Sequence, residues 1–149
     1  MRVRLLGLGL AAVVFAGTAA CDEDLSTLAG PTPNLEPTFS SIQTEIFNTT
    51  DSSGRLACIN CHNAAGAPFN GLNLTSAVSY GNLVGVASRG RPTVLRVAPG
   101  APEDSYLVHK LDGRPSIVGT RMPRGTGPFL TAGQITIIRR WIELGAQNN

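Results

Sequence analysis

The strongest hydrophobic pattern lies near the end of the chain. Apolar residues recur there every three to four positions in two adjacent stripes: Ile135, Ile138 and Ile142, and beside them Ile137, Trp141 and Leu144. This spacing predicts a helix with a wide buried face. Thr131 and Gln134 predict a capping box at its start, and Gly145 predicts its end. Arg139 and Glu143 predict an ion pair on its outer face, since they are four residues apart.

Weaker apolar patterns predict three shorter helices over residues 40–47, 76–84 and 102–111. Ser40 and Gln43 fit a capping box for the first of them. The segments between these helices are rich in glycine and proline, and no alternating run is long enough to predict a strand. We therefore expect a mainly α fold. It forms a single domain over residues 38–149, with about four helices and long loops.

The N-terminal residues 1–20 follow the pattern of a secretory signal peptide. Arg2 and Arg4 precede an apolar run over residues 5–17, and the small residues Ala19 and Ala20 follow it. A membrane span needs about 20 apolar residues, so the run is short for a permanent anchor helix. We favour a cleaved signal peptide, with a permanent anchor as the alternative.

Cys21 directly follows the predicted cleavage site. The string TAAC resembles the lipobox of bacterial lipoproteins, in which the cysteine becomes the lipidated N-terminus, although Thr18 stands where a large aliphatic residue is expected. Lipidation of Cys21 also accounts for an odd number of cysteines in an exported chain. Plain cleavage after Ala20 is the alternative. After Cys21, residues 22–37 are acidic and then rich in proline, so segment 21–37 is predicted to be a flexible linker.

The motif CINCH carries the candidate chemistry. Cys58, Cys61 and His62 have the spacing of covalent haem attachment, in which two thioethers hold the porphyrin and the imidazole is the proximal iron ligand. A redox dithiol would require a βαβ context, which the sequence lacks. A structural zinc site would require four ligands, and only His109 adds to these three. A disulfide between the two cysteines leaves His62 without a role. We therefore favour one covalent haem c.

Met122 is the only methionine besides the first residue, and it lies between Arg121 and Pro123 in a glycine- and proline-rich loop. A lone methionine often fills a core, but this loop position favours the sixth iron ligand. His109 is the rival ligand. It lies about 200° around its helix from Leu107, which is expected to face the core, so we expect His109 on the surface.

Basic residues are concentrated in one stretch of the chain. Between Arg89 and Arg124 seven basic residues outnumber three acidic ones, whereas ten of each remain in the whole chain once Arg2 and Arg4 are removed. The chain has no recognisable nucleic-acid motif and is predicted to be exported, so we expect no nucleic-acid partner. Haem propionates or an acidic protein partner fit this stretch better.

The order of these features resembles a class I cytochrome c over about residues 38–146: a helix, CxxCH, a long middle segment, a Met-Pro loop and a C-terminal helix. The strings GLNL, YGNLV, RVAPGAPEDSYLVHKL, RMP and IIRRWIELGA resemble the small single-haem modules of exported and lipoprotein cytochromes of Gram-negative bacteria. The resemblance implies ligation by His62 and Met122. It also implies that the first helix, through Phe39, Ile42 or Ile46, crosses the last helix near residues 138–142.

With this resemblance further residues acquire expected roles. The candidates for propionate contacts are Arg91, Arg96, Arg121 and Arg124. The candidates for the haem wall are Pro68, Leu72, Leu74, Tyr80, Leu95, Leu107, Phe129 and Trp141. The segment 49–57 is longer than the helix-to-haem junction of the smallest cytochromes, so its local backbone is expected to differ.

The resemblance implies a periplasm-facing one-electron carrier rather than an enzyme, since a haem iron with two axial ligands has no open position for a substrate. Its expected partners are redox proteins of the periplasm or the membrane, with a lipid anchor at Cys21. The alternatives are a haem-based ligand-binding or sensory protein, and an accessory haem module of a larger membrane dehydrogenase.

Overall fold

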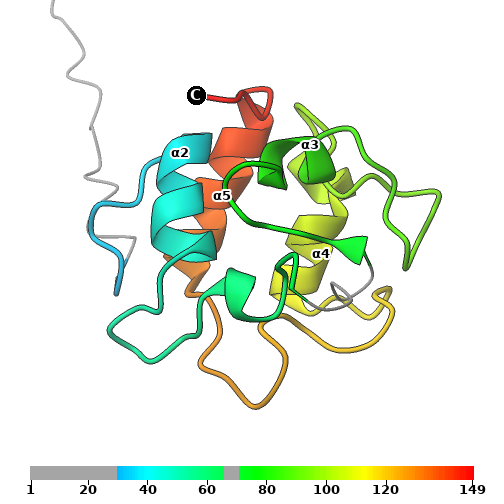
Figure 1. Cartoon of the computed structure of the whole chain (residues 1–149). Helices are drawn as coiled ribbons and strands as arrows, with labels where there is room; N and C mark the ends of the chain where they lie inside the picture. The colour runs from blue at the N-terminus through cyan, green and yellow to red at the C-terminus, as the bar shows by residue number, and fades with distance from the viewer. Residues whose placement is uncertain (1–29, 66–70) are drawn as a thin grey trace, which may run out of the picture.

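Helices supply the regular structure in the computed structural model, which describes residues 30–65 and 71–149 (Figure 1). The predicted signal peptide, Cys21 and Pro68 lie outside the described residues. Within them the α-helices are α2 (Phe39–Ile42), α3 (Ser79–Leu83), α4 (Tyr106–Asp112) and α5 (Ala132–Glu143). Short turns of other helix types are η1 (Gln43–Phe47), η2 (Cys58–Asn60) and η4 (Pro102–Asp104). The described part contains isolated bridges but no strand, so the mainly α prediction is confirmed.

Helix α5 forms as its sequence pattern predicts. The Thr131 side chain accepts a hydrogen bond from the amide of Gln134, and the Gln134 side chain bonds back to the amide of Thr131. The helix buries Ile137, Ile138 and Ile142 completely. Gly145 has a φ of 97° just past the last turn, a conformation that glycine adopts without strain. The capping box sets the start of α5 and the apolar stripes set its buried face. As a result α5, the longest helix among the described residues, packs into the core.

The first helical element is continuous from α2 into the π-helical turn η1. Its N-cap is Thr38, whose side chain accepts a hydrogen bond from the amide of Ser41, so the capping box predicted at Ser40 and Gln43 is wrong. The element lies beside α5 in Figure 1, and the ring centroids of Phe39 and Trp141 are 5.5 Å apart. The predicted contact between the first and last helices is therefore confirmed at these two rings.

Ion pairs join α4, η4 and α5. Arg139 pairs with Asp112 at 2.5 Å and also with Glu103, and both carboxylates pair with Arg114. Arg139 faces α4 and pairs with these two carboxylates, so its predicted pairing with Glu143 is wrong. Glu143 pairs instead with Arg140, three residues before it, at 2.7 Å.

The N-terminal border of the domain lies earlier than predicted. Thr32 and Leu35 are only 2% and 1% exposed, and the side-chain amide of Gln134 donates to the Thr32 hydroxyl at 3.0 Å. The predicted flexible linker is therefore wrong from Thr32 onward. The buried side chain of Leu35 and the bond from Gln134 of α5 to the Thr32 hydroxyl tie this segment to the domain.

Candidate functional site

The CxxCH motif forms a tight turn. Residues Cys58–Asn60 make the 3-10 turn η2, and the Cys58 carbonyl accepts hydrogen bonds from the amides of Cys61 and His62 at 3.2 and 2.9 Å. Cys58 is half-buried against the core, whereas Cys61 is exposed. No disulfide joins the two thiols. The turn thus presents two free thiols and an imidazole from one short segment.

The segment before the motif is held by Arg55, which is completely buried. Its Nε donates to the Asp51 carboxylate at 2.9 Å. Its two terminal nitrogens donate to four backbone carbonyls, those of Glu45, Ile46, Thr49 and Leu56. All five N–H donors of the guanidinium therefore have an acceptor, which is the condition for burying a charge.

Asp51 completes this buried pair. Its side chain accepts hydrogen bonds from the hydroxyl and amide of Ser53 and from the amide of Arg55. Segment 49–57 was expected to differ from a short junction, and it forms an ordered loop built on the Asp51–Arg55 pair. The sequence reasoning missed both residues. The string DSSG carried the available signal, because an aspartate before serine and glycine is typical of a turn that bonds its own backbone.

Burial governs the protonation of Cys58. It raises the pKa of the thiol to about 11, although the positive charge of Arg55 acts in the opposite direction. The Cys58 thiol donates to the Ile46 carbonyl, with a sulfur–oxygen distance of 3.5 Å. Redox-active dithiols have a thiol whose pKa is lowered, so this environment counts against the redox dithiol interpretation.

His62 is half-buried and braced by the segment that follows it. Its carbonyl accepts a hydrogen bond from the Leu74 amide at 2.9 Å. Burial lowers the pKa of His62, and the charges of Lys110 and Arg96 lower it further, while a hydrogen bond with the Leu72 backbone opposes them. The lowered pKa favours the neutral imidazole, which is the form that ligates a metal.

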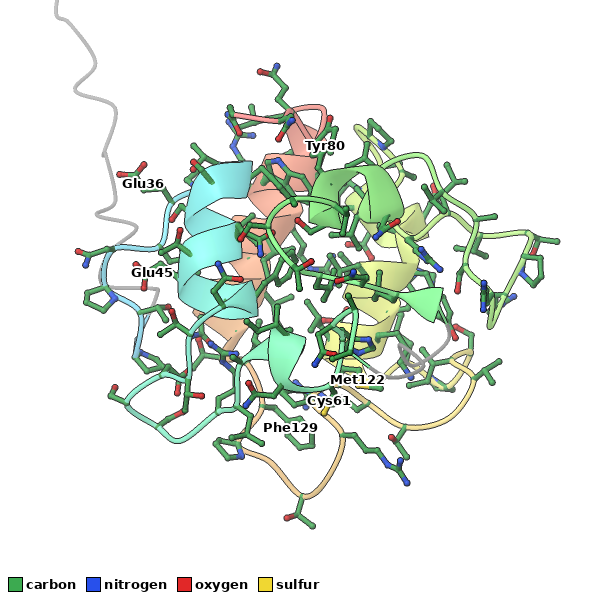
Figure 2. All side chains as sticks on the ribbon, in the orientation of Figure 1. Glu36, Glu45, Cys61, Tyr80, Met122 and Phe129 are labelled. Atoms are coloured by element: carbon green, nitrogen blue, oxygen red, sulfur yellow. The ribbon has the colours of Figure 1, made fainter. Side chains whose placement is uncertain are left out.

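Met122 packs its half-buried side chain against the core. Its amide donates to the carbonyl of Lys110 at 2.9 Å. Lys110 is therefore a neighbour of Met122 through its backbone and of His62 through its charge. In Figure 2 the side chains of Cys61, Met122 and Phe129 lie at the same end of the molecule. The two predicted iron ligands thus share Lys110 as a neighbour.

The four arginines predicted to contact propionates have different surroundings. Arg96 donates to the carbonyl of Asn82 at 2.7 Å, and its charge acts on His62. Arg121 donates to the Leu111 carbonyl and lies over the Phe129 ring, 4.2 Å from its centroid. Arg91 donates to the carbonyl of Ser116, and Arg124 is exposed. Among these four arginines, only Arg96 is a charge that acts on His62. Lys110 acts on His62 in the same way, but it was not singled out from the other basic residues of its stretch.

The residues predicted for the haem wall separate into three groups. Leu72, Tyr80 and Leu107 are half-buried and pack against the core, and Phe129 is half-buried under Arg121. Leu74 and Trp141 are buried within the core, where the Trp141 indole donates to the Gln147 carbonyl. Leu95 is 37% exposed and lines a cavity of about 320 Å³ together with His109.

His109 is buried, so its predicted place on the surface is wrong. Only 9% of the residue is exposed, and its Nε2 lies 2.6 Å from the Glu103 carbonyl. Its Nδ1 has no hydrogen-bond partner among the described residues. The reason is η4, because this turn folds over the side of α4 that helical periodicity assigns to solvent.

Within the described residues, no three side chains of the types His, Cys, Asp and Glu gather to hold a metal ion. A haem iron would use a different set, the nitrogen of His62 and the sulfur of Met122.

The chain matches no protein-family model, no curated protein and no solved structure. The described residues include no helix of the length and apolarity that a membrane crossing requires.

Proposed function

We propose that this chain is a c-type cytochrome that transfers single electrons. The observation that carries the proposal is the turn at Cys58–His62, which offers two unlinked thiols beside a neutral, backbone-braced imidazole. These are the groups that attach and ligate haem c, and their arrangement suits no other use as well. The mainly α fold with a helix pair at Phe39 and Trp141 agrees with the class I cytochrome fold, which is part of the same proposal.

In this proposal Cys58 and Cys61 hold the haem by thioethers, and His62 and Met122 ligate its iron. The haem supplies the electron-carrying iron; the chain supplies orientation, burial and charge. The buried Arg55–Asp51 pair fixes the backbone before Cys58. Lys110 and Arg96 supply positive charge near His62 and would be available to pair with the propionate carboxylates of a haem. Thioether ligation by Met122 favours the ferrous state and raises the potential.

The test is the pigment of the full chain made in a host that matures c-type cytochromes. We expect a visible spectrum of low-spin haem, a pyridine haemochrome of two thioether bonds, and a mass increased by one haem. A variant with serine at both Cys58 and Cys61 should lack the pigment. A well-folded, colourless wild-type product at its peptide mass would refute the proposal.

A haem-based sensor is the second candidate, and one observation favours it. Residues 124–128, directly after Met122 and Pro123, are all exposed, so few contacts hold the loop that carries the sixth ligand. Carbon monoxide distinguishes the two functions. Rapid binding to the reduced protein at neutral pH supports the sensor, whereas slow or absent binding supports the carrier. Co-purification of a larger dehydrogenase would support the third candidate, an accessory haem module.

Export and a lipid anchor at Cys21 belong to the same proposal, and they place the haem domain on the periplasmic side of a membrane. Their support is the sequence of residues 1–21. Labelling with a radioactive fatty acid should mark the wild-type chain, and a Cys21→Ser variant should remain unlabelled and appear in the soluble periplasmic fraction. An unlabelled wild type would favour plain cleavage after Ala20.

A further inference from the structure

The loop that carries Met122 is held to the end of α4 by Lys110. The Lys110 ammonium donates to the Val118 carbonyl at 3.1 Å and also to the carbonyl of Thr120. The Lys110 carbonyl accepts from the Met122 amide at 2.9 Å. Lys110 therefore bonds three alternate positions of segment 118–122, and the last of them is Met122.

The end of α4 explains why the loop binds there. The last four carbonyls of an α-helix have no partner within the helix. Lys110 and Leu111 lie in the last turn of α4, and their carbonyls accept instead from the Met122 amide and from Nε of Arg121, the latter at 2.6 Å. Segment 121–122 thus supplies donors to the open end of the helix, and the Lys110 side chain adds two bonds to residues further back in the loop.

The loop on both sides of Met122 is open to solvent. Residues 118–120 and 124–128 are exposed, whereas Met122 itself is half-buried. Tyr106 adds one bond to this loop, because its hydroxyl accepts from the Val118 amide at 2.9 Å. An exposed segment has few packing contacts, so its hydrogen bonds to α4 decide how far it moves.

We propose that Lys110 is a positioning residue for the candidate iron ligand Met122. By clamping residues 118–122 on α4, Lys110 limits how often the Met122 sulfur leaves the iron, and it thereby limits the entry of external ligands such as carbon monoxide. The Lys110 side chain thus favours the closed electron carrier over the ligand-binding sensor. This inference rests on the proposed function, because it requires a haem iron for Met122 to ligate.

The experiment compares variants of the full haem-loaded chain with the wild type. Lys110→Met keeps the apolar stem and removes the bonds to Val118 and Thr120, whereas the backbone bond to Met122 remains. Tyr106→Phe removes a different bond between the same helix and the same loop, so it is the matched control.

Three quantities are measured on each variant: the rate of carbon monoxide binding to the reduced protein, the exchange rate of the Met122 amide hydrogen, and Tm. Carbon monoxide occupies the iron position that Met122 leaves, so its binding rate reports how often the sulfur departs. The reduction potential is not used as a readout, because removing a positive charge alters it whether or not Met122 moves.

For Lys110→Met we expect carbon monoxide to bind about tenfold faster, because the two lost bonds are exposed and together contribute roughly one net hydrogen bond. The Met122 amide should also exchange faster. Lys110→Gln, whose side chain is shorter and uncharged, provides a second variant with the same expected rise. Tyr106→Phe should lower Tm while it leaves both rates near their wild-type values. In a Met122→Ala background, Lys110→Met should change the carbon monoxide rate no further, since the sulfur is already absent.

The outcomes separate this inference from the function on which it rests. A wild-type chain without covalent haem refutes the proposed function. A wild-type chain with low-spin haem, together with a Lys110→Met variant of unchanged carbon monoxide binding and unchanged Met122 amide exchange, refutes the positioning role alone. Equal acceleration in Lys110→Met and Tyr106→Phe would also refute it, because any loosening of the loop would then suffice. Acceleration by Lys110→Met in the Met122→Ala background would refute it as well, because the effect would then not pass through Met122.

Discussion

Replacing Arg55 tests the buried pair that precedes the CxxCH motif. In Arg55→Leu the side chain of Asp51, only 1% exposed, is left without its cation, and four backbone carbonyls lose a donor. Removing one partner of a buried ion pair costs about 3–5 kcal/mol. A domain of this size has a total stability of about 5–15 kcal/mol, so the loss is a large part of it.

The assay is urea and thermal unfolding of the haem-loaded chain. A loss of about 4 kcal/mol corresponds to a fall in Tm of roughly 15–20 °C. Arg124→Leu is the matched control, because Arg124 is exposed, and it should change stability by less than about 0.5 kcal/mol. An Arg55→Leu variant within about 1 kcal/mol of the wild type would refute the reasoning, since it would mean that the pair adds nothing to the fold.

The pH dependence gives the same prediction an independent check. Burial by itself raises the pKa of Asp51, but hydrogen bonds from Ser53 and the charge and hydrogen bonds of Arg55 lower it below its ordinary value. The stability from this carboxylate is therefore present above its ordinary pKa and is lost as the pH falls through the lower folded value. In Arg55→Leu burial acts without that compensation. The difference in stability between wild type and variant should thus be smaller at pH 3 than at pH 7.

Three further predictions concern other parts of the molecule. Burial lowers the pKa of His109, and the charges of Arg114 and Arg91 lower it further against Asp104 and Asp112, so the stability from the neutral ring should be complete above about pH 6.5 and fall as the pH drops toward the folded pKa. Urea midpoints at pH 7 and pH 5 should differ more in the wild type than in His109→Leu, and equal differences would contradict this prediction. Met122→Ala should lower the reduction potential and make carbon monoxide binding to the reduced protein rapid, measured by stopped-flow spectroscopy, whereas unchanged values would remove Met122 from the iron. Trp141→Ala should cost about 3–5 kcal/mol in urea unfolding, because the side chain is 1% exposed and packs on Phe39; a loss below about 1 kcal/mol would show that this contact is dispensable.

The last helix was predictable because its local signals agree with its tertiary place. The capping box at Thr131 and the apolar stripes are properties of the segment itself, and burial reinforces them. The first helix shows where such reasoning fails. Gln43 fitted a capping box by its spacing, yet its side chain turns inward to bond Leu74 and Ser79, residues 31 and 36 positions away. No local pattern reports partners at such separations.

The candidate site likewise has residues that the sequence can suggest and surroundings that it cannot. Cys58, Cys61 and His62 could be proposed from the sequence because their chemistry depends on residue type and short spacing. Met122 could be proposed because it is the only methionine after the first residue and lies in a loop rich in glycine and proline. Their surroundings could not be proposed. Lys110 approaches both His62 and Met122 only because α4 and the Met-Pro loop come together in space. Helical periodicity assigned His109 to the solvent, because it takes no account of the η4 turn that covers this residue.

The attachment of Thr32 and Leu35 to the domain limits the distance at which a membrane-bound form of this protein can hold the domain from the bilayer. If the lipid is carried by Cys21, only the nine residues up to Gly30 remain to separate the domain from the bilayer, a fully stretched reach of about 30 Å. That reach ends at the start of α5, where Thr131 approaches Gly30. Under the proposed function, electron donors and acceptors would then have to meet the domain within a shallow layer above the lipid surface, and lengthening this stretch with glycine and serine would widen the layer.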